Sequence, residues 1–236
     1  MWNIIEKNND YVKRQRNNEY ELSYKNGSFA RWLSHDNGNT PCDKLVNLIP
    51  SENEEAITVP NGVTEIGYGA FAFYETDSGE WTCVPSNLKS VTLPSSVTHV
   101  ESGAFAFLEL KEVVLNGCTA VKVENGAVLS PDGARFIYKL LENDGTFSYE
   151  VPNGVTEIAE DAFFAFDMNV ILPPTVKQIC SNAFGVNFCN VVVPASVNKI
   201  GKNAFSKYST MVVERNSYAH KWAKRNKVKF EFIKNK

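Results

Sequence analysis

The sequence predicts an α+β repeat solenoid of short strands, turns and small helical segments, capped at both ends. Five segments of the 236-residue chain align with one another, and in each of them a proline precedes a phenylalanine by eleven positions. Apolar residues two apart stand just before each proline, which is the spacing of a short strand with one buried face. A unit of this length cannot bury its apolar side alone, so the units must stack on one another.

The proline and phenylalanine positions define the repeat. Proline ends each strand because it has no N–H for the ladder, and a Val–Ile pair three residues apart follows on the return leg. Alanine precedes each phenylalanine in a predicted helical turn. We expect the five phenylalanines to form one continuous buried spine. The pairs are Pro60 and Phe71, Pro94 and Phe105, Pro152 and Phe163, Pro173 and Phe184, and Pro194 and Phe205.

The repeat places the other segments of a single predicted domain. Residues 1–56 are expected to form an N-terminal cap with a hairpin, and residues 57–208 the solenoid. Uneven proline spacing implies inserts near 75–87 and 117–147, with a degenerate coil at 111–116. Residues 209–236 should form a C-terminal cap, because Ser217 can N-cap a helix and an alternating apolar strand follows.

The run [VI]-x-[VL]-P-x-x-V-x-x-[IV]-x-x-x-A-F resembles the BspA-type leucine-rich repeat from residue 57 to about residue 208. This family is a solenoid common in surface and adhesive proteins of bacteria and some protozoa, and it has no shared catalytic residues. The resemblance implies a recognition surface. The first ten residues lack the apolar segment of a secretory signal. The chain as written is therefore cytoplasmic, or is a secreted or surface protein whose leader has been removed.

Composition and motifs favour a globular protein without catalytic chemistry. The chain is 43% hydrophobic and 22% charged, and no apolar run approaches the roughly 18–20 residues of a membrane span. Nucleophile-elbow, phosphate-loop, dinucleotide and zinc-protease motifs are absent from the sequence. We therefore predict no enzyme, no cofactor and no metal. The cysteines are expected to be reduced thiols, at positions 42, 83, 118, 180 and 189.

The residue between the two buried positions of each strand should point to solvent, and this outward row becomes apolar toward the C-terminus. It runs from threonine and glutamate in the early coils to Ile171 and Val192, with Val212 as an extension. We hypothesise that these three residues form a patch that binds a protein or a second copy of the chain. The alternative is local coverage by a cap or hairpin.

The second insert contains a predicted β-hairpin. Asn125-Gly126 and Asp132-Gly133 mark tight turns around Val128, and an apolar run that includes Phe136 and Tyr138 follows. One interpretation is a protruding contact element in which Val128, Phe136 and Tyr138 meet a partner, since insertions in repeat arrays often bind. The other is decoration that the coil tolerates.

Charge is distributed unevenly along the chain. Residues 199–236 hold 11 Lys and Arg against two Glu, a net charge of +9, while the other 198 residues hold 13 basic against 25 acidic groups, or −12. Lys221, Lys224 and Arg225 form a basic patch on the predicted helix. A solvated cap helix is favoured over phosphate binding, and without a binding motif or interleaved aromatic residues no nucleic-acid partner is expected.

The function that these features predict is a non-catalytic protein-interaction or adhesion module. It would bind its partner through the sheet face of the solenoid and the inserted hairpin. The alternative is a structural component that self-associates through the same face. The sequence leaves the identity of the partner open.

Overall fold

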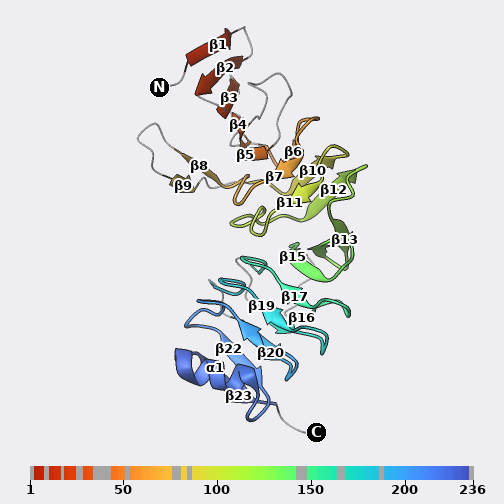
Figure 1. Cartoon of the computed structure of the whole chain (residues 1–236), viewed down its shortest axis with the longest axis vertical. Helices are drawn as coiled ribbons and strands as arrows, with labels where there is room; N and C mark the ends of the chain where they lie inside the picture. The colour runs from red at the N-terminus through yellow and green to blue at the C-terminus, as the bar shows by residue number, and fades with distance from the viewer. Residues whose placement is uncertain are drawn as a thin grey trace. The chain divides into compact units, whose positions relative to one another are not determined.

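The computed structural model describes residues 3–7, 11–16, 19–24, 29–33, 44–50, 54–75, 81–83, 87–141, 148–163, 168–185 and 189–233. The chain divides into two compact units, residues 1–121 and 122–236. Each unit is a stack of short parallel strands and turns, as the repeat predicts, and each is described by itself (Figure 1).

The first unit opens with an antiparallel meander. Its five strands pair each with the next in sequence, and the fifth pairs in parallel with the short return-leg strand of the first coil, so that the cap and the coils share one sheet. The predicted hairpin is the pair β3–β4. The strands of this sheet are β1 (Asn3–Lys7), β2 (Tyr11–Arg16), β3 (Glu19–Tyr24), β4 (Phe29–Leu33), β5 (Lys44–Ile49), β7 (Glu65–Ile66) and β11 (His99–Val100).

A second, parallel sheet of the first unit holds β6 (Ala56–Thr58), β10 (Ser90–Pro94) and β12 (Glu112–Asn116). Register aligns Val91 with Ile57 and with Val113, so the segment at 111–116 is a coil of the repeat although it lacks the proline. The insert near 75–87 contains the antiparallel pair β8 (Phe73–Glu75) and β9 (Trp81–Cys83).

The second unit has two sheets and a helix. One sheet has the order β13-β14-β15-β17-β19-β21 and the other the order β16-β18-β20-β22-β23. Helix α1 packs against β21, β22 and β23, and Figure 1 shows it next to β22 and β23. The elements are β13 (Lys122–Glu124), β14 (Ala127–Leu129), β15 (Arg135–Lys139), β16 (Ser148–Glu150), β17 (Glu157–Ile158), β18 (Asn169–Ile171), β19 (Gln178–Ile179), β20 (Asn190–Val193), β21 (Lys199–Ile200), β22 (Thr210–Val213), α1 (Tyr218–Asn226) and β23 (Lys229–Phe232).

The predicted hairpin of the second insert is present, but it is part of the solenoid sheet. Strands β13, β14 and β15 pair antiparallel, and β15 then pairs in parallel with β17. At the turn between β14 and β15, Asp132 Oδ1 accepts hydrogen bonds from Ser130 Oγ at 2.6 Å and from the Ala134 N–H at 3.0 Å. The insert therefore starts the sheet of this unit.

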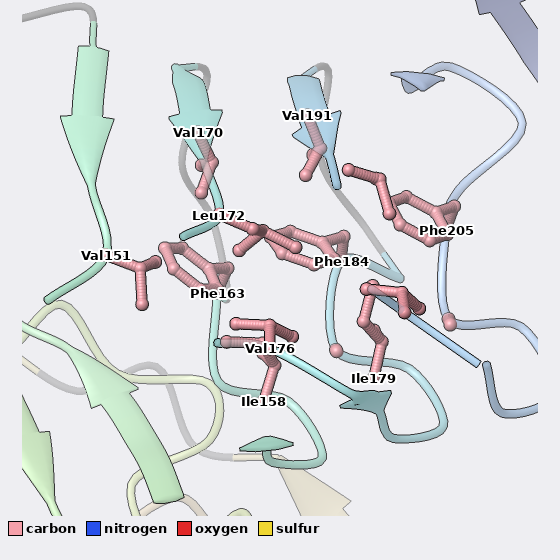
Figure 2. Packing of buried hydrophobic residues seen from close by; sticks show 14 of the residues in the cluster. Val151, Ile158, Phe163, Val170, Leu172, Val176, Ile179, Phe184, Val191 and Phe205 are labelled. Atoms are coloured by element: carbon pink, nitrogen blue, oxygen red, sulfur yellow. The ribbon is translucent and has the colours of Figure 1, made fainter. Parts of the chain in front are cut away.

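Phenylalanine rings stack from coil to coil inside each unit. In the first unit Phe71 and Phe105 are parallel, with centroids 5.8 Å apart. The second unit stacks four rings, with successive centroid distances of 4.8, 4.8 and 5.1 Å, and Trp222 meets the last ring edge-on at 5.9 Å. Figure 2 shows three of these rings between valines of the strands and isoleucines of the return legs. The four stacked rings belong to Phe136, Phe163, Phe184 and Phe205.

Two residues before each phenylalanine of the repeat, the backbone adopts a left-handed conformation. The φ angle at these positions lies between 53° and 70°, a region that glycine, asparagine and aspartate tolerate best. The Ala-Phe segment that follows is not helical in any of these coils, and α1 is the single helix in the described residues. The left-handed residues are Gly69, Gly103, Asp161, Asn182 and Asn203.

The C-terminal cap begins with the predicted N-cap. Ser217 Oγ accepts a hydrogen bond from the His220 N–H at 3.1 Å, and Ala219, Trp222 and Ala223 are the buried residues of α1. The helix ends at Lys227, which is left-handed and donates its N–H to the Ala223 carbonyl. This reversal returns the chain to β23, which pairs in parallel with β22.

An ion cluster joins the N-terminal meander to the first coils. Lys44 Nζ lies 2.8 Å from Glu65 Oε1 and donates a hydrogen bond to Glu101 Oε1, while Glu101 Oε2 accepts the Tyr68 N–H at 2.8 Å. Burial alone would raise the pKa of Glu101, but the hydrogen bonds from Lys44 and Tyr68 outweigh burial and hold this pKa below its ordinary value. Burial alone would lower the pKa of Lys44, but its contacts with the Glu101 and Glu65 carboxylates outweigh burial and hold this pKa above its ordinary value.

We predict that Phe184→Ala lowers the free energy of unfolding by about 3–5 kcal/mol, because the ring is fully buried between two others. Thermal and urea unfolding measure the effect. Tyr218→Ala is the control, since its ring is 38% exposed and its loss should change little. Equal stability of Phe184→Ala and the parent would contradict a stabilising stack.

We also predict that Asn203→Val costs about 1–2 kcal/mol, because a β-branched side chain clashes in the left-handed region. Asn203→Gly should stay within about 0.5 kcal/mol of the parent, since the site is exposed and glycine adopts this backbone freely. Urea unfolding of the two variants separates backbone strain from loss of the side chain. If both variants lose the same stability, the backbone conformation is not the cause.

The Glu101 carboxylate predicts a pH-dependent contribution to stability. A pKa lowered by folding stabilises the protein above the unfolded value near 4.5, and this contribution disappears as the pH falls through the lower folded pKa. Glu101→Gln should therefore be less stable than the parent near pH 7, and the difference should shrink below about pH 4.5. Urea unfolding at several pH values tests this, and a difference that stays constant down to pH 3 would count against the ion cluster.

Candidate contact surface on the strand face

The parallel register of the second unit aligns Ile171, Val192 and Val212, named here the apolar row. Ile171 on β18 pairs with Val192 on β20, which pairs with Val212 on β22. The residues on either side of each position point inward and are buried, as strand alternation requires. Ile171 is 37% exposed and both valines are half-buried. The apolar row therefore lies on the outer face of its sheet, where the sequence predicts it.

A carboxylate stands at each end of the apolar row. Glu150 on β16 pairs with Ile171, and Glu231 on β23 pairs with Val212; both glutamates are exposed. Five strands thus present one line of side chains that is acidic at the ends and apolar in the middle. Because neighbouring strands lie about 4.8 Å apart, the line is roughly 19 Å long.

Polar side chains border the apolar row on the same face. Asn169 and Asn190 pair across β18 and β20, and Asn190 Nδ2 donates a hydrogen bond to Asn169 Oδ1 at 2.9 Å. Exposed Lys229 continues this polar row on β23, next to buried Thr210. The apolar row therefore has a polar margin on this side.

The first unit has a corresponding outward row that the sequence analysis missed in part. Thr58, Thr92 and Val114 align across β6, β10 and β12, and Val114 is 37% exposed. Val114 lies on the degenerate coil at 111–116, which the sequence predicts, but its outward position was not included in the predicted row. The alternation of buried Val113 with exposed Val114 was the available signal. An exposed apolar residue thus occurs on this face of the first unit as well.

The hypothesis of an exposed contact element in the second insert is wrong for its named residues. Val128, Phe136 and Tyr138 are 0%, 0% and 1% exposed. For Phe136 the reason is that the hairpin packs into the core, where its ring stacks on Phe163. Alternation within a hairpin shows that one face is apolar, but it does not show whether a neighbouring coil covers that face.

The sequence analysis also missed a buried lysine in this insert. Lys139 is 1% exposed; its Nζ donates a hydrogen bond to the Leu140 carbonyl at 2.6 Å and lies 4.4 Å from the centroid of the Tyr149 ring. Tyr149 in turn donates its hydroxyl hydrogen to the Asn125 carbonyl at 2.8 Å. These contacts hold the insert against the first strand of the second sheet.

The predicted basic patch lies on α1. Lys221, Lys224 and Arg225 are exposed, and no carboxylate of the described residues forms an ion pair with them. On the other side of the cap, the Arg215 guanidinium lies 4.0 Å from the centroid of the Phe232 ring. The choice between a solvated cap and phosphate binding stays a prediction.

Histidine, cysteine and carboxylate side chains elsewhere are the remaining candidates for a metal or reactive site. Within the described ranges no three His, Cys, Asp or Glu side chains are placed to hold a metal ion. Cys118 and Cys189 are buried and form no disulfide, and Cys180 is half-buried. Burial raises the pKa of the Cys180 thiol, which disfavours the reactive thiolate. His99 is exposed. Cys42 and the side chain of Cys83 lie outside the described part.

Comparison with solved structures finds four matching chains, of which three are described here. A leucine-rich cell surface protein of Faecalibacterium prausnitzii A2-165 is 19% identical, over 86% of this chain and 55% of its own, with a TM-score of 0.38. Pneumococcal vaccine antigen PcpA is 14% identical, over 86% and 82%, with a TM-score of 0.32. A leucine-rich repeat protein of Eubacterium ventriosum ATCC 27560 is 13% identical, over 85% and 71%, with a TM-score of 0.34.

The chain thus spans about half the length of the first of these proteins, and at these TM-scores we draw no functional conclusion from the likenesses. No curated protein matches the chain significantly. In the part that the structure describes, no helix is long and apolar enough to cross a membrane.

A family model matches most of the chain. The BspA type Leucine rich repeat region matches residues 51–127 and 140–217 with six copies. The matched ranges include all five proline–phenylalanine pairs and the degenerate coil at 111–116. Together with the stacked coils, this match shows that the chain belongs to the BspA-type leucine-rich repeat family.

Proposed function

We propose that the chain is a non-catalytic protein-interaction module of the adhesive type, and that it binds its partner through the apolar row of the second unit. The observation that carries the proposal is the parallel register that brings Ile171, Val192 and Val212 side by side on an outer sheet face. Repeat families of this kind suggest protein interaction or a surface role, and membership in the family supports the proposal.

Exposure of the apolar row to water is unfavourable in free energy. A solenoid coil keeps its fold with any polar residue at the outward strand position, as Thr58, Thr92 and Glu150 demonstrate at equivalent positions. Three neighbouring apolar residues at this position add nothing to the buried core, and they leave apolar surface in water. A partner that covers these three side chains would remove their apolar surface from water, which favours binding.

The shape of the row favours a small, specific contact. Three apolar side chains in a line with a polar margin supply a short anchor for an apolar ridge of a partner, while the two flanking carboxylates favour basic groups at its ends. A surface of this kind binds and orients a partner, and it needs no reactive group.

We predict that Ile171→Glu/Val192→Glu removes partner binding without unfolding the chain. Protein-binding clones are selected from a displayed domain library on the parent chain and are then measured against each variant by surface plasmon resonance. Most selected clones should bind the double variant at least about tenfold more weakly, because carboxylates buried against an apolar partner surface and the lost apolar contact both oppose binding. Circular dichroism verifies the fold.

The matched control is Lys177→Glu/Lys202→Glu, which places glutamates at exposed positions away from the strand face. Clones that bind the parent, the double variant and the control equally would refute the proposed surface. Light scattering tests the alternative that the apolar row joins identical chains. In that case the parent and the control should show a mass that rises with concentration, and Ile171→Glu/Val192→Glu should not. Loss of folding in the double variant would show that the row is internal.

A further inference from the structure

Strand β23 ends the second sheet of the second unit. Within the described residues it pairs with β22 on one side only, and the order of the sheet places it at the edge. A strand at an edge offers unpaired backbone groups to another strand. The direction of its backbone groups and the charges of its side chains decide what kind of strand can pair with this edge.

The hydrogen bond from the Ile233 N–H to the Val213 carbonyl, at 3.1 Å, shows which backbone groups face outward. Along a strand the N–H and C=O of one residue point to the same side, and the next residue points to the other side. Residues 229, 231 and 233 therefore direct their backbone groups toward β22. The N–H and C=O groups of Phe230 and Phe232 point away from the sheet.

The side chains of β23 alternate in charge on the outer face. Lys229 and Glu231 are both exposed, and no ion pair of the described residues includes either. On the inner face Phe230 and Phe232 are half-buried, with ring centroids 4.9 and 5.1 Å from that of His220. The outer face of this edge strand thus carries a basic side chain at Lys229 and an acidic side chain two residues later at Glu231.

We propose that β23 is a self-complementary edge that pairs antiparallel with β23 of a second copy of the chain, about a two-fold axis at Phe230. In this register the outward backbone groups of the two Phe230 residues form a hydrogen-bonded pair. Lys229 then faces Glu231 of the second copy, and Glu231 faces Lys229 of the second copy. The occupant is identified by this charge complementarity.

The neighbouring registers are disfavoured by the same two charges. A shift of two residues in one direction places Glu231 opposite itself, and a shift in the other places Lys229 opposite itself. After a shift of one residue, the outward N–H and C=O groups of one copy face residues of the second copy whose N–H and C=O groups point toward its own β22. Electrostatics and hydrogen bonding therefore select the same alignment.

The contact closes on itself, because a two-fold interface uses the same patch on both chains and ends at a dimer. It is also small, well below a standard interface of about 1,600 Å², so we expect weak, rapidly reversible association. The cations of α1 oppose it at low salt. At about 0.15 M salt the Debye length is roughly 8 Å, which screens these distant charges more than the facing Lys–Glu pairs.

Charge exchange tests the proposal. Sedimentation equilibrium of the full chain is measured up to about 1 mM at 0.15 M salt for the parent, Lys229→Glu, Glu231→Lys and the double variant Lys229→Glu/Glu231→Lys. Each single variant places like charges opposite each other twice, so its dimer constant should fall at least about tenfold. The double variant restores opposite charges and should recover the association of the parent.

A mixture of the two single variants provides a second arm. The acidic edge of Lys229→Glu should pair with the basic edge of Glu231→Lys, so the mixture should form heterodimers although neither variant dimerises alone. Lys202→Glu, an exposed charge reversal in another coil, should associate as the parent does. Ile171→Glu/Val192→Glu should also keep the dimer, which separates this edge from the apolar row.

A parent that remains monomeric at about 1 mM overturns the proposal, and so does a double variant that associates no better than the single variants. Association that persists in every variant would place the contact elsewhere on the chain. Because the substituted side chains are exposed, circular dichroism and thermal unfolding should match those of the parent.

Discussion

Ring stacking between successive coils is the interaction on which the rest of this structure depends. One coil has two short strands and two turns, and it cannot enclose its own phenylalanine, so each ring is buried by the rings of the coils beside it. The spacing of about 5 Å between centroids matches the spacing of paired strands. Small alanine before the ring and a left-handed residue before that alanine both serve this close approach.

This constraint separates the positions that hold the fold from those left for contact. Inward strand residues and phenylalanines repeat because every layer must cover the next, whereas the outward strand position is free of that demand. Variation along the outward row from glutamate through isoleucine and valine to glutamate again is therefore informative. The inner pattern is common to the repeat, and the outer row is particular to this chain.

The periodic features could be predicted from the sequence because each is a local rule repeated five times. Register of the coils, the Ser217 cap and the outward place of Ile171 all follow from such rules. Phe136 could not be placed, because its burial depends on a neighbouring coil far along the chain. The burial of Lys139 and the left-handed backbone of Lys227 could not be predicted for a related reason. Tertiary contacts at both positions override the usual preference of lysine.

The ends of a stack pose a different problem from its middle. Interior strands have partners on both sides, whereas β23 has one partner within the described residues. Charges on an edge strand commonly protect it from pairing, and Lys229 with Glu231 do so selectively. Open-ended growth would need β23 of one copy to pair with a different strand of the next copy, whereas pairing of β23 with β23 uses the edge of both copies. In antiparallel pairing each charge meets its opposite. The antiparallel pair therefore closes at two chains, and it leaves no β23 edge for further growth.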